Sequence, residues 1–254
     1  MFYPFYVQVS KIMALIILTF SLLIPFTPAN QEIAEIRAGG IVLPEGFTVT
    51  AHAGAMYTPD NTIFSLKQIV ATDADIVEFD LHFRADGTAV LSHDAPAENG
   101  GVLLADALEV IAGNPVIRMN IDAKSARNLP VVQELLIEYG LLDRAFFTGI
   151  ERGRVAAVKR DCPEVPFYLN CSIAPGADLQ ALADEVKGLG ALGVNINYND
   201  ASRELCEVMH ANGLLVSVWT VNDILSMYKM LSFGVDNITT RNPILLREII
   251  NNRL

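Results

Sequence analysis

The sequence predicts an α/β fold in which eight parallel strands close into a (β/α)8 barrel. From about Phe47 to the C-terminus, short β-rich runs alternate with segments of helical period. Eight runs of each kind occur, which is the number that a closed barrel needs. No linker or low-complexity stretch divides this region, so one domain is expected. An open doubly wound sheet would alternate in the same way, so periodicity leaves both architectures open.

The expected strands are apolar runs rich in β-branched and aromatic residues. They are Phe47–His52, Ile76–Phe83, Val116–Lys124, Ala145–Ile150, Phe167–Ile173, Val194–Tyr198, Leu214–Val221 and Asn237–Thr240. A further short run, Val90–His93, follows the turn pair Asp86-Gly87. This spacing predicts a local hairpin on the second βα unit.

The segments between these runs have the apolar spacing of helices that cover a sheet. They are Thr62–Ala71, Leu103–Ala112, Pro130–Tyr139, Arg152–Lys159, Leu179–Leu189, Ser202–Ala211, Asp223–Phe233 and Pro243–Ile250. Capping side chains are expected at the start of three of them, from Asp60 or Asn61, from Ser202 and from Asn222.

The first 29 residues read as a targeting segment rather than as part of the barrel. Ile12–Ile24 is an apolar run that follows Lys11, and it is shorter than the roughly 20 residues of a membrane span. It predicts a secretory signal cut near Thr27-Pro28-Ala29, with an uncleaved N-terminal membrane anchor as the alternative. Residues 30–254 then form the barrel, and the chain is expected to be exported to the periplasm, the cell surface or the medium.

The composition excludes several classes of protein. Lys and Arg number 18 against 29 Asp and Glu, which gives a formal charge of −11 and argues against nucleic acid as a partner. A hydrophobic content of 52% excludes a disordered chain. The three cysteines, Cys162, Cys171 and Cys206, lack the CxxC spacing of zinc and redox sites, although two of them could pair in an exported chain.

Acidic side chains gather on the second and third expected strands. Glu78, Asp80 and His82 are spaced by two, so they share one face of their strand. Two carboxylates that point into a barrel repel each other unless a cation or a proton lies between them. Asp122 on the next strand supplies a third oxygen ligand, and an all-oxygen set favours Ca²⁺ or Mg²⁺ over zinc. A structural ion pair with Lys124 is the alternative role for Asp122, and a peripheral role is expected for His82.

Two histidines and the single tryptophan fall at expected strand ends. His52 closes the first strand and His93 follows the hairpin. One imidazole can deprotonate an attacking hydroxyl while the other protonates a leaving alkoxide near neutral pH. A structural turn histidine is the alternative for His52. Trp219 ends the seventh strand, where it either packs in the core or forms a wall of the substrate site.

The ordered set of motifs resembles the glycerophosphodiester phosphodiesterase family. The resemblance runs from Phe47 to the C-terminus, and no single motif is specific alone. The motifs are His52-x-Gly54, Pro59-Asp60-Asn61-Thr62, Glu78-x-Asp80, Asp86-Gly87-x-x-Val90-x-x-His93-Asp94, Asp122-x-Lys124 and Trp219-Thr220-Val221-Asn222.

This resemblance implies a TIM barrel of the phospholipase C-like phosphodiesterase superfamily. It implies metal-dependent hydrolysis of a small-molecule glycerophosphodiester to glycerol 3-phosphate and an alcohol, with a neighbouring substrate hydroxyl attacking phosphorus first. Carried over to this chain, the roles are His52 and His93 as the acid/base pair, Glu78, Asp80 and Asp122 as ligands of Ca²⁺ or Mg²⁺, and Lys124, Asn61 and Trp219 as substrate contacts.

Three departures from the family pattern are present. The arginine that usually follows the first histidine is replaced by Ala53, and the segment from His93 to Leu103 is too short for the family's helical hood. The last strand ends in Thr240-Arg241 where the family commonly has Thr-Asp. Because the first and last strands of a closed barrel are neighbours, Arg241 could supply the missing phosphate contact. Otherwise the enzyme is weakened.

Two other functions remain open from the sequence. A barrel that binds metal and phospho-ligand without turnover is consistent with Ala53. A related phospholipase-type enzyme that releases a cyclic phosphate would use the same residues. The sequence leaves the alcohol group of the substrate and the oligomeric state undetermined.

Overall fold

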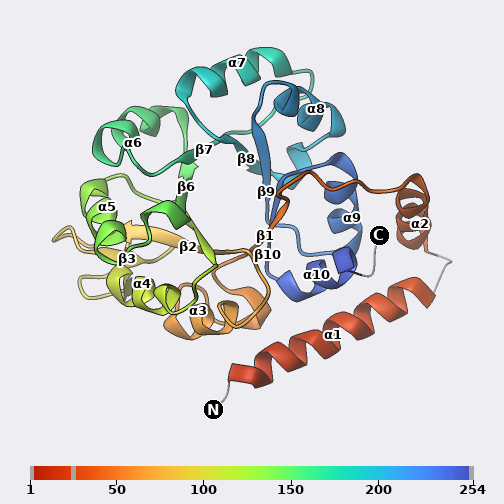
Figure 1. Cartoon of the computed structure of the whole chain (residues 1–254), viewed down its shortest axis with the longest axis horizontal. Helices are drawn as coiled ribbons and strands as arrows, with labels where there is room; N and C mark the ends of the chain where they lie inside the picture. Colours follow the sequence, from red (N-terminus) through yellow and green to blue (C-terminus); the bar gives the residue numbers. More distant parts are fainter. Residues whose placement is uncertain (1–2, 24–26, 252–254) are drawn as a thin grey trace.

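The computed structural model describes residues 3–23 and 27–251, and its centre is a closed barrel of parallel strands (Figure 1). β1 (Thr48–Ala51) pairs with β2 on one side and with β10 on the other, so the sheet closes on itself. The order around the barrel is β1, β2, β5, β6, β7, β8, β9 and β10. The predicted (β/α)8 barrel is therefore confirmed, and the open doubly wound sheet is excluded.

The remaining barrel strands match the predicted runs closely. They are β2 (Ile76–Phe83), β5 (Arg118–Ala123), β6 (Ala145–Ile150), β7 (Phe167–Asn170), β8 (Gly193–Asn197), β9 (Leu215–Trp219) and β10 (Asn237–Thr240). Several predicted runs extend beyond the observed strands at their carboxyl ends. β7 ends at Asn170 rather than Ile173 because its ladder with β8 stops there and the chain turns into a loop.

The predicted hairpin on the second unit is also present. β3 (Ala89–Leu91) runs antiparallel to β2, and β4 (Val102–Leu103) runs antiparallel to β3. The turn is built by Asp86, whose carboxylate accepts a hydrogen bond from the Thr88 amide at 2.9 Å, and by Gly87 at φ 88°. No helix lies between β3 and β4, in agreement with the predicted absence of a hood.

Helices surround the barrel, with short 3₁₀ turns in several connections. They are α3 (Ile63–Ile69), α4 (Leu104–Ala112), α5 (Leu129–Glu138), α6 (Val155–Asp161), α7 (Leu179–Leu189), α8 (Arg203–Ala211), α9 (Ile224–Phe233) and α10 (Pro243–Asn251), with η1 (Ala55–Tyr57), η2 (Leu142–Arg144), η3 (Arg152–Arg154) and η4 (Tyr198–Asp200). The predicted cap Ser202 is confirmed, because its hydroxyl accepts a hydrogen bond from the Leu205 amide at 3.1 Å.

Two predicted caps are wrong. Thr62 caps α3 instead of Asp60 or Asn61, and Asp223 caps α9 instead of Asn222. The two asparagines bond elsewhere: the Asn61 amide group contacts Asp80, and the Asn222 Oδ1 accepts from the Arg241 backbone amide at 2.8 Å. Both therefore tie loops together at the carboxyl end of the barrel.

The N-terminal segment forms two helices outside the barrel (Figure 1). α1 (Tyr3–Leu23) packs against α10, α3 and η1, and it buries Val7, Ala14 and Leu18. α2 (Pro28–Gly39), which the sequence did not predict, packs against α9. Within the described ranges no helix has both the length and the apolar character needed to cross a bilayer. The last residue of the predicted apolar run, Ile24, lies outside the described residues.

The strands divide their side chains between two environments. Along β2, Val77, Phe79 and Leu81 are completely buried in the apolar layer, whereas Glu78 and Asp80 alternate with them and point into the barrel. The apolar side chains that pack between the barrel and its helices therefore fix the strand so that its polar side chains point into the barrel. The three cysteines are free thiols, and two of them are buried.

Candidate active site and metal centre

A cavity of about 390 Å³ lies at the carboxyl ends of the barrel strands. We call it the polar cavity, because most of its lining groups are ionisable or hydrogen-bonding. It brings together seven of the nine predicted site residues, namely His52, Glu78, Asp80, His93, Asp122, Lys124 and Trp219. Asn61 and Arg241 lie outside the lining, although both bond to residues near it.

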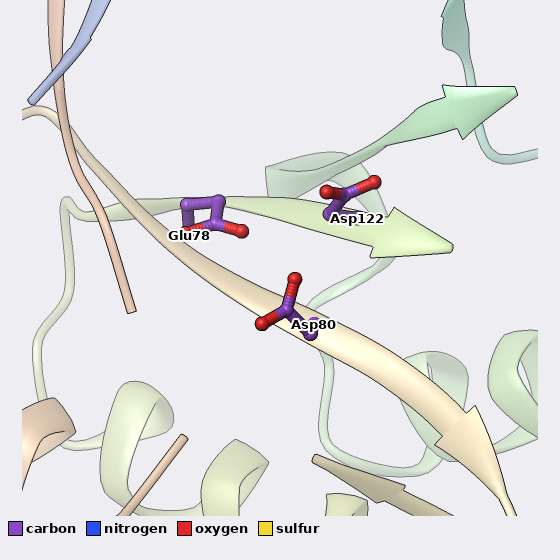
Figure 2. A group of neighbouring side chains, drawn as sticks. All are labelled: Glu78, Asp80 and Asp122. Atoms are coloured by element: carbon purple, nitrogen blue, oxygen red, sulfur yellow. The ribbon is translucent and has the colours of Figure 1, made fainter. Parts of the chain in front are cut away.

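The three predicted metal ligands form one cluster, as Figure 2 shows. Glu78 and Asp80 come from β2 and Asp122 from β5, and strand register places Asp80 directly beside Asp122. Each of the three offers one oxygen within 4.8 Å of the others. Parallel pairing of two strands thus converts a two-residue spacing in the sequence into a compact triad of carboxylates.

The cluster is too buried and too acidic to be stable as three free anions. Burial raises the pKa of Glu78 well above its usual range, and the carboxylates of Asp80 and Asp122 add to the shift. Burial also raises the pKa of Asp122, whose Oδ1 is buried without a hydrogen-bond partner among the described residues. An unpartnered oxygen beside two other carboxylates fits a hard cation such as Ca²⁺ or Mg²⁺.

Gly149 of β6 makes room for the Asp122 side chain. Its φ of 72° lies in the left-handed region, and a Cβ at this position would overlap Asp122 Oδ1. A cradle formed by a glycine backbone holds the carboxylate without covering its oxygen. The residues present therefore fit a divalent metal ion.

Lys124 neutralises part of this acidic charge. Its Nζ lies 2.6 Å from Asp122 Oδ2 and 3.1 Å from Asp80 Oδ1. Burial alone would lower the pKa of Lys124, but the two carboxylates outweigh it and raise the pKa above its usual value. The ammonium group is therefore charged, and the ion pair considered as an alternative role for Asp122 exists with Asp80 as a second partner.

The two histidines face the same cavity from different environments. The His52 side chain is 19% exposed and its Nδ1 lies 4.0 Å from Glu78 Oε2, whereas the His93 side chain is 68% exposed. Burial lowers the pKa of His52 to about 4, and the nearby Arg241 guanidinium adds to this effect. His93 Nδ1 lies 3.0 Å from Asp94 Oδ1, which engages that nitrogen and directs the ring.

The backbone after His52 forms a hydrogen bond with one carboxylate of the triad. The amide of Ala53 donates to Glu78 Oε2 at 2.8 Å, so the residue that replaces the family arginine orients a predicted metal ligand through its main chain. Ala53 is itself buried.

The two predicted residues outside the lining hold the rim of the site. Asn61 Nδ2 donates to Asp80 Oδ2 at 2.6 Å, and the Asp80 amide donates to Asn61 Oδ1 at 3.0 Å. Arg241 forms a bidentate pair with Asp60 at 2.8 and 2.6 Å. Gly54 permits this pair, because a Cβ there would lie 2.7 Å from Arg241 Nη1 and would overlap the Asp60 carboxylate.

Sequence reasoning missed several lining residues. Asn170, Asn195 and Thr148 lie on successive strands inside the barrel, and Asn195 Nδ2 donates to Asn170 Oδ1 at 3.2 Å. Asparagine is depleted in strands, so its presence in two predicted strands was a usable signal. Arg154 also lines the cavity, with Nη1 2.7 Å from the Ala123 carbonyl. No local pattern marks it, since it ends the 3₁₀ turn η3.

The comparisons with known proteins agree with this geometry. The Glycerophosphoryl diester phosphodiesterase family matches residues 52–121 and 116–245, which together span both histidines and the three carboxylates. The chain belongs to this family. The prediction of family and enzyme class is therefore confirmed.

Relatives and solved structures are similar over most of their length. A glycerophosphodiester phosphodiesterase from Bacillus subtilis (strain 168) is 24% identical, with 94% of this chain and 98% of the relative covered. A solved glycerophosphodiester phosphodiesterase from Parabacteroides distasonis has a TM-score of 0.67 at 21% identity, covering 82% of this chain and 98% of that one. An Oleispira antarctica phosphodiesterase, solved with the product sn-glycerol-3-phosphate, has a TM-score of 0.67 at 21% identity, with 82% and 97% covered.

Proposed function

We propose that the protein hydrolyses glycerophosphodiesters to glycerol 3-phosphate and an alcohol with the aid of a bound Ca²⁺ or Mg²⁺. The observation that carries this proposal is the carboxylate triad in a cavity that two histidines also line. When bound, the metal would supply positive charge that polarises a phosphoryl oxygen. Glu78, Asp80 and Asp122 would hold it.

The two histidines would move the protons of the reaction. One ring accepts the proton of the attacking hydroxyl, and the other donates a proton to the leaving alkoxide. The Asp94 contact engages His93 Nδ1, so His93 Nε2 would be the nitrogen that acts on a substrate. His52 belongs to the loop that carries the Ala53 amide, and the bond from this amide to Glu78 would fix the distance between His52 and the metal site.

Cationic and aromatic groups around the cavity would position the phosphodiester. Lys124 lies between two carboxylates, where it can hold a phosphoryl oxygen as a point charge. Arg241 can offer a planar guanidinium from the adjacent loop, in place of the arginine that Ala53 replaces. Trp219 is 37% exposed and would form one wall, while Asn61 contacts the substrate or orients Asp80 toward it.

The test is release of glycerol 3-phosphate from sn-glycero-3-phosphoethanolamine by the purified full chain. We expect turnover with added Ca²⁺ or Mg²⁺ and none with excess EDTA, and titration of each ion alone identifies the preferred one. The absence of turnover, together with metal-dependent thermal stabilisation by glycerol 3-phosphate, would favour a binding module instead. Accumulation of a cyclic phosphate would favour the phospholipase-type reaction.

We also propose that the N-terminal segment is retained and lies at a membrane surface. α1 buries one face on the barrel and exposes Val9, Ile12, Leu15 and Ile16 on the other, which is the arrangement of an interfacial helix. Export of the chain is part of this proposal. Cell fractionation and the intact mass of the native chain test it, because a mass that begins near residue 30 would show signal cleavage.

A further inference from the structure

A second cavity of about 430 Å³ lies between α1, α2 and the carboxyl end of the barrel. We call it the apolar cavity. Met13, Ala14 and Ile17 line it from α1, Ile33 from α2, and Leu225 from α9. Its volume lies in the range of pockets that bind small organic ligands.

Polar residues also line the apolar cavity, namely Ser10 on α1, Asn30 on α2, and Asp223 with two asparagines on the barrel side. Asn222 and Asn242 line it from the loops after β9 and β10, and the Asn242 side chain donates to the Asn222 carbonyl at 3.1 Å. Both asparagines also line a neighbouring hollow together with Tyr57 and Arg241. Most of the hydrocarbon lining therefore lies beneath α1, and two amide side chains line the cavity at the loops after β9 and β10.

The hollow at Arg241 connects the apolar cavity with the histidine loop. Tyr57 lines both the hollow and the apolar cavity, and Gly54 lines the hollow. The Gly54 amide lies 3.5 Å from His52 Nδ1, and His52 lines the polar cavity. A continuous row of rim residues thus leads from the predicted catalytic histidine to the space beneath α1.

We propose that the apolar cavity binds a single hydrocarbon chain of the phosphodiester substrate. The phosphate would lie in the polar cavity, and the chain would pass Arg241 and Tyr57 to end beside Ala14 and Ile17. The substrate is then an amphiphile with one alkyl or acyl chain, carried on its glycerol or on its alcohol. This inference rests on the proposed function and names the substrate class of the same site.

The reaction on such a substrate balances as an ordinary hydrolysis. The phosphorus–oxygen bond to the alcohol breaks, and the alkoxide leaves as the alcohol after taking a proton. Water supplies that proton overall, and its hydroxyl remains on the phosphate monoester. The hydrocarbon chain of the substrate affects only where the substrate binds and takes no part in the reaction.

The experiment compares two homologous series with the full chain, each at concentrations below micelle formation. One series is sn-glycero-3-phosphoalkanols with two, four, six and eight carbons in the alkanol. The other is 1-O-alkyl-sn-glycero-3-phosphoethanols with the same chain lengths. Each buried methylene improves binding about threefold to fourfold. We therefore expect kcat/KM to rise at least tenfold from two to eight carbons in one of the two series, and that series identifies whether the chain is carried on the alcohol or on the glycerol.

Filling the cavity should remove this dependence on chain length. We expect Ala14→Phe to cut kcat/KM for the eight-carbon substrate at least tenfold, and to change that for the two-carbon substrate less than twofold. Gln8→Phe adds the same ring to an exposed position of α1 and should change neither value. Leu225→Trp fills the cavity from the barrel side and repeats the test if Ala14→Phe disturbs the helix.

The outcomes separate this inference from the proposed function. Turnover of the two-carbon substrates with no effect of chain length in either series would overturn the inference and leave the hydrolase intact. Equal loss on short and long substrates in both filling variants would also overturn it. A native chain whose intact mass lacks residues 6–23 would overturn it as well, because α1 forms one wall. No turnover of any substrate would refute the proposed function itself.

Discussion

The polar cavity is lined by side chains of the barrel strands, whereas the apolar cavity lies between the barrel and two helices that precede it. In the first, the carboxylates of Glu78 and Asp122 are held close together at a cost, since burial and the nearby carboxylate of Asp80 raise the pKa of both. In the second, burial of Ala14 and Ile33 releases water from apolar surface and is favourable. The contrast separates side chains that are held close together despite their repulsion from side chains whose burial stabilises the fold.

The largest expected effect is at the carboxylate triad. Glu78→Gln keeps an acceptor for the Ala53 amide but removes one of the charges that would hold the metal. We expect kcat/KM for glycerophosphoethanolamine to fall about a thousandfold, while the metal-free protein melts at the same or a higher temperature because a buried repulsion is gone. Thermal melts with and without Mg²⁺ or Ca²⁺ check the second part.

Glu185→Gln is the matched control for this change, because Glu185 pairs with Arg152 on the protein surface. It should keep full activity and full stabilisation by metal. Undiminished metal stabilisation in Glu78→Gln would show that the triad does not hold the ion.

The next effect concerns the exposed histidine. His93→Ala removes one of the two groups that we propose to transfer protons, and general acid–base catalysis contributes about a hundredfold or more to the rate. We expect kcat to fall by that factor with KM changed less than threefold. His82→Ala provides the comparison: His82 lies on β2 but outside the polar cavity, so its loss should leave kcat within threefold. Similar kinetics in the two variants would remove His93 from the mechanism.

A smaller effect is expected at the rim between the cavities. Arg241→Ala should raise KM and lower kcat/KM about tenfold, because the proposed charge-assisted contact of this partly exposed arginine with the phosphate is lost. Arg160→Ala removes another arginine of a bidentate pair, in this case an exposed pair with Asp161, and should have no effect. Unchanged kinetics in Arg241→Ala would mean that this arginine serves only to tie Asp60 to the last strand.

The smallest effect on turnover of chain-free substrates is expected from the apolar cavity. Ile33 is only 5% exposed, so Ile33→Ala should lower the free energy of unfolding by about 2–3 kcal/mol, with kcat/KM for glycerophosphoethanolamine within twofold. Val42→Ala, at a position that is 88% exposed, should change stability by less than about 0.5 kcal/mol. Urea titration measures both. A large loss of activity in Ile33→Ala would contradict the separation of the two cavities.

The same contrast explains what the sequence could predict. The alternation of strands and helices followed from local periodicity, whereas the choice of a closed barrel over an open sheet needed the count of eight units and the family resemblance. The triad followed from two-residue spacings on strands that lie side by side. Arg154 and the second partner of Lys124 depend on how separate segments pack after the chain has folded, and no local pattern carries that information. The start of α2 does carry a local signal, Thr27 as the cap followed by Pro28, but the same residues also fit the cleavage site predicted from the sequence. The apolar cavity is the extreme case, because an apolar run such as Ile12–Ile24 reads as a targeting segment whether or not it packs on the barrel.

The pairing of β1 with β10 has a consequence for the newly made chain. Thr48 and Asn237 are 189 positions apart and hydrogen-bond directly, so the barrel cannot close until nearly all of the chain has left the ribosome. Contacts between such distant residues form slowly. Until then His52 has no partner in the last strand and Arg241 has not been joined to Asp60. We therefore expect truncated nascent chains to be inactive, and we expect catalytic activity to appear in a single late step, when the barrel closes.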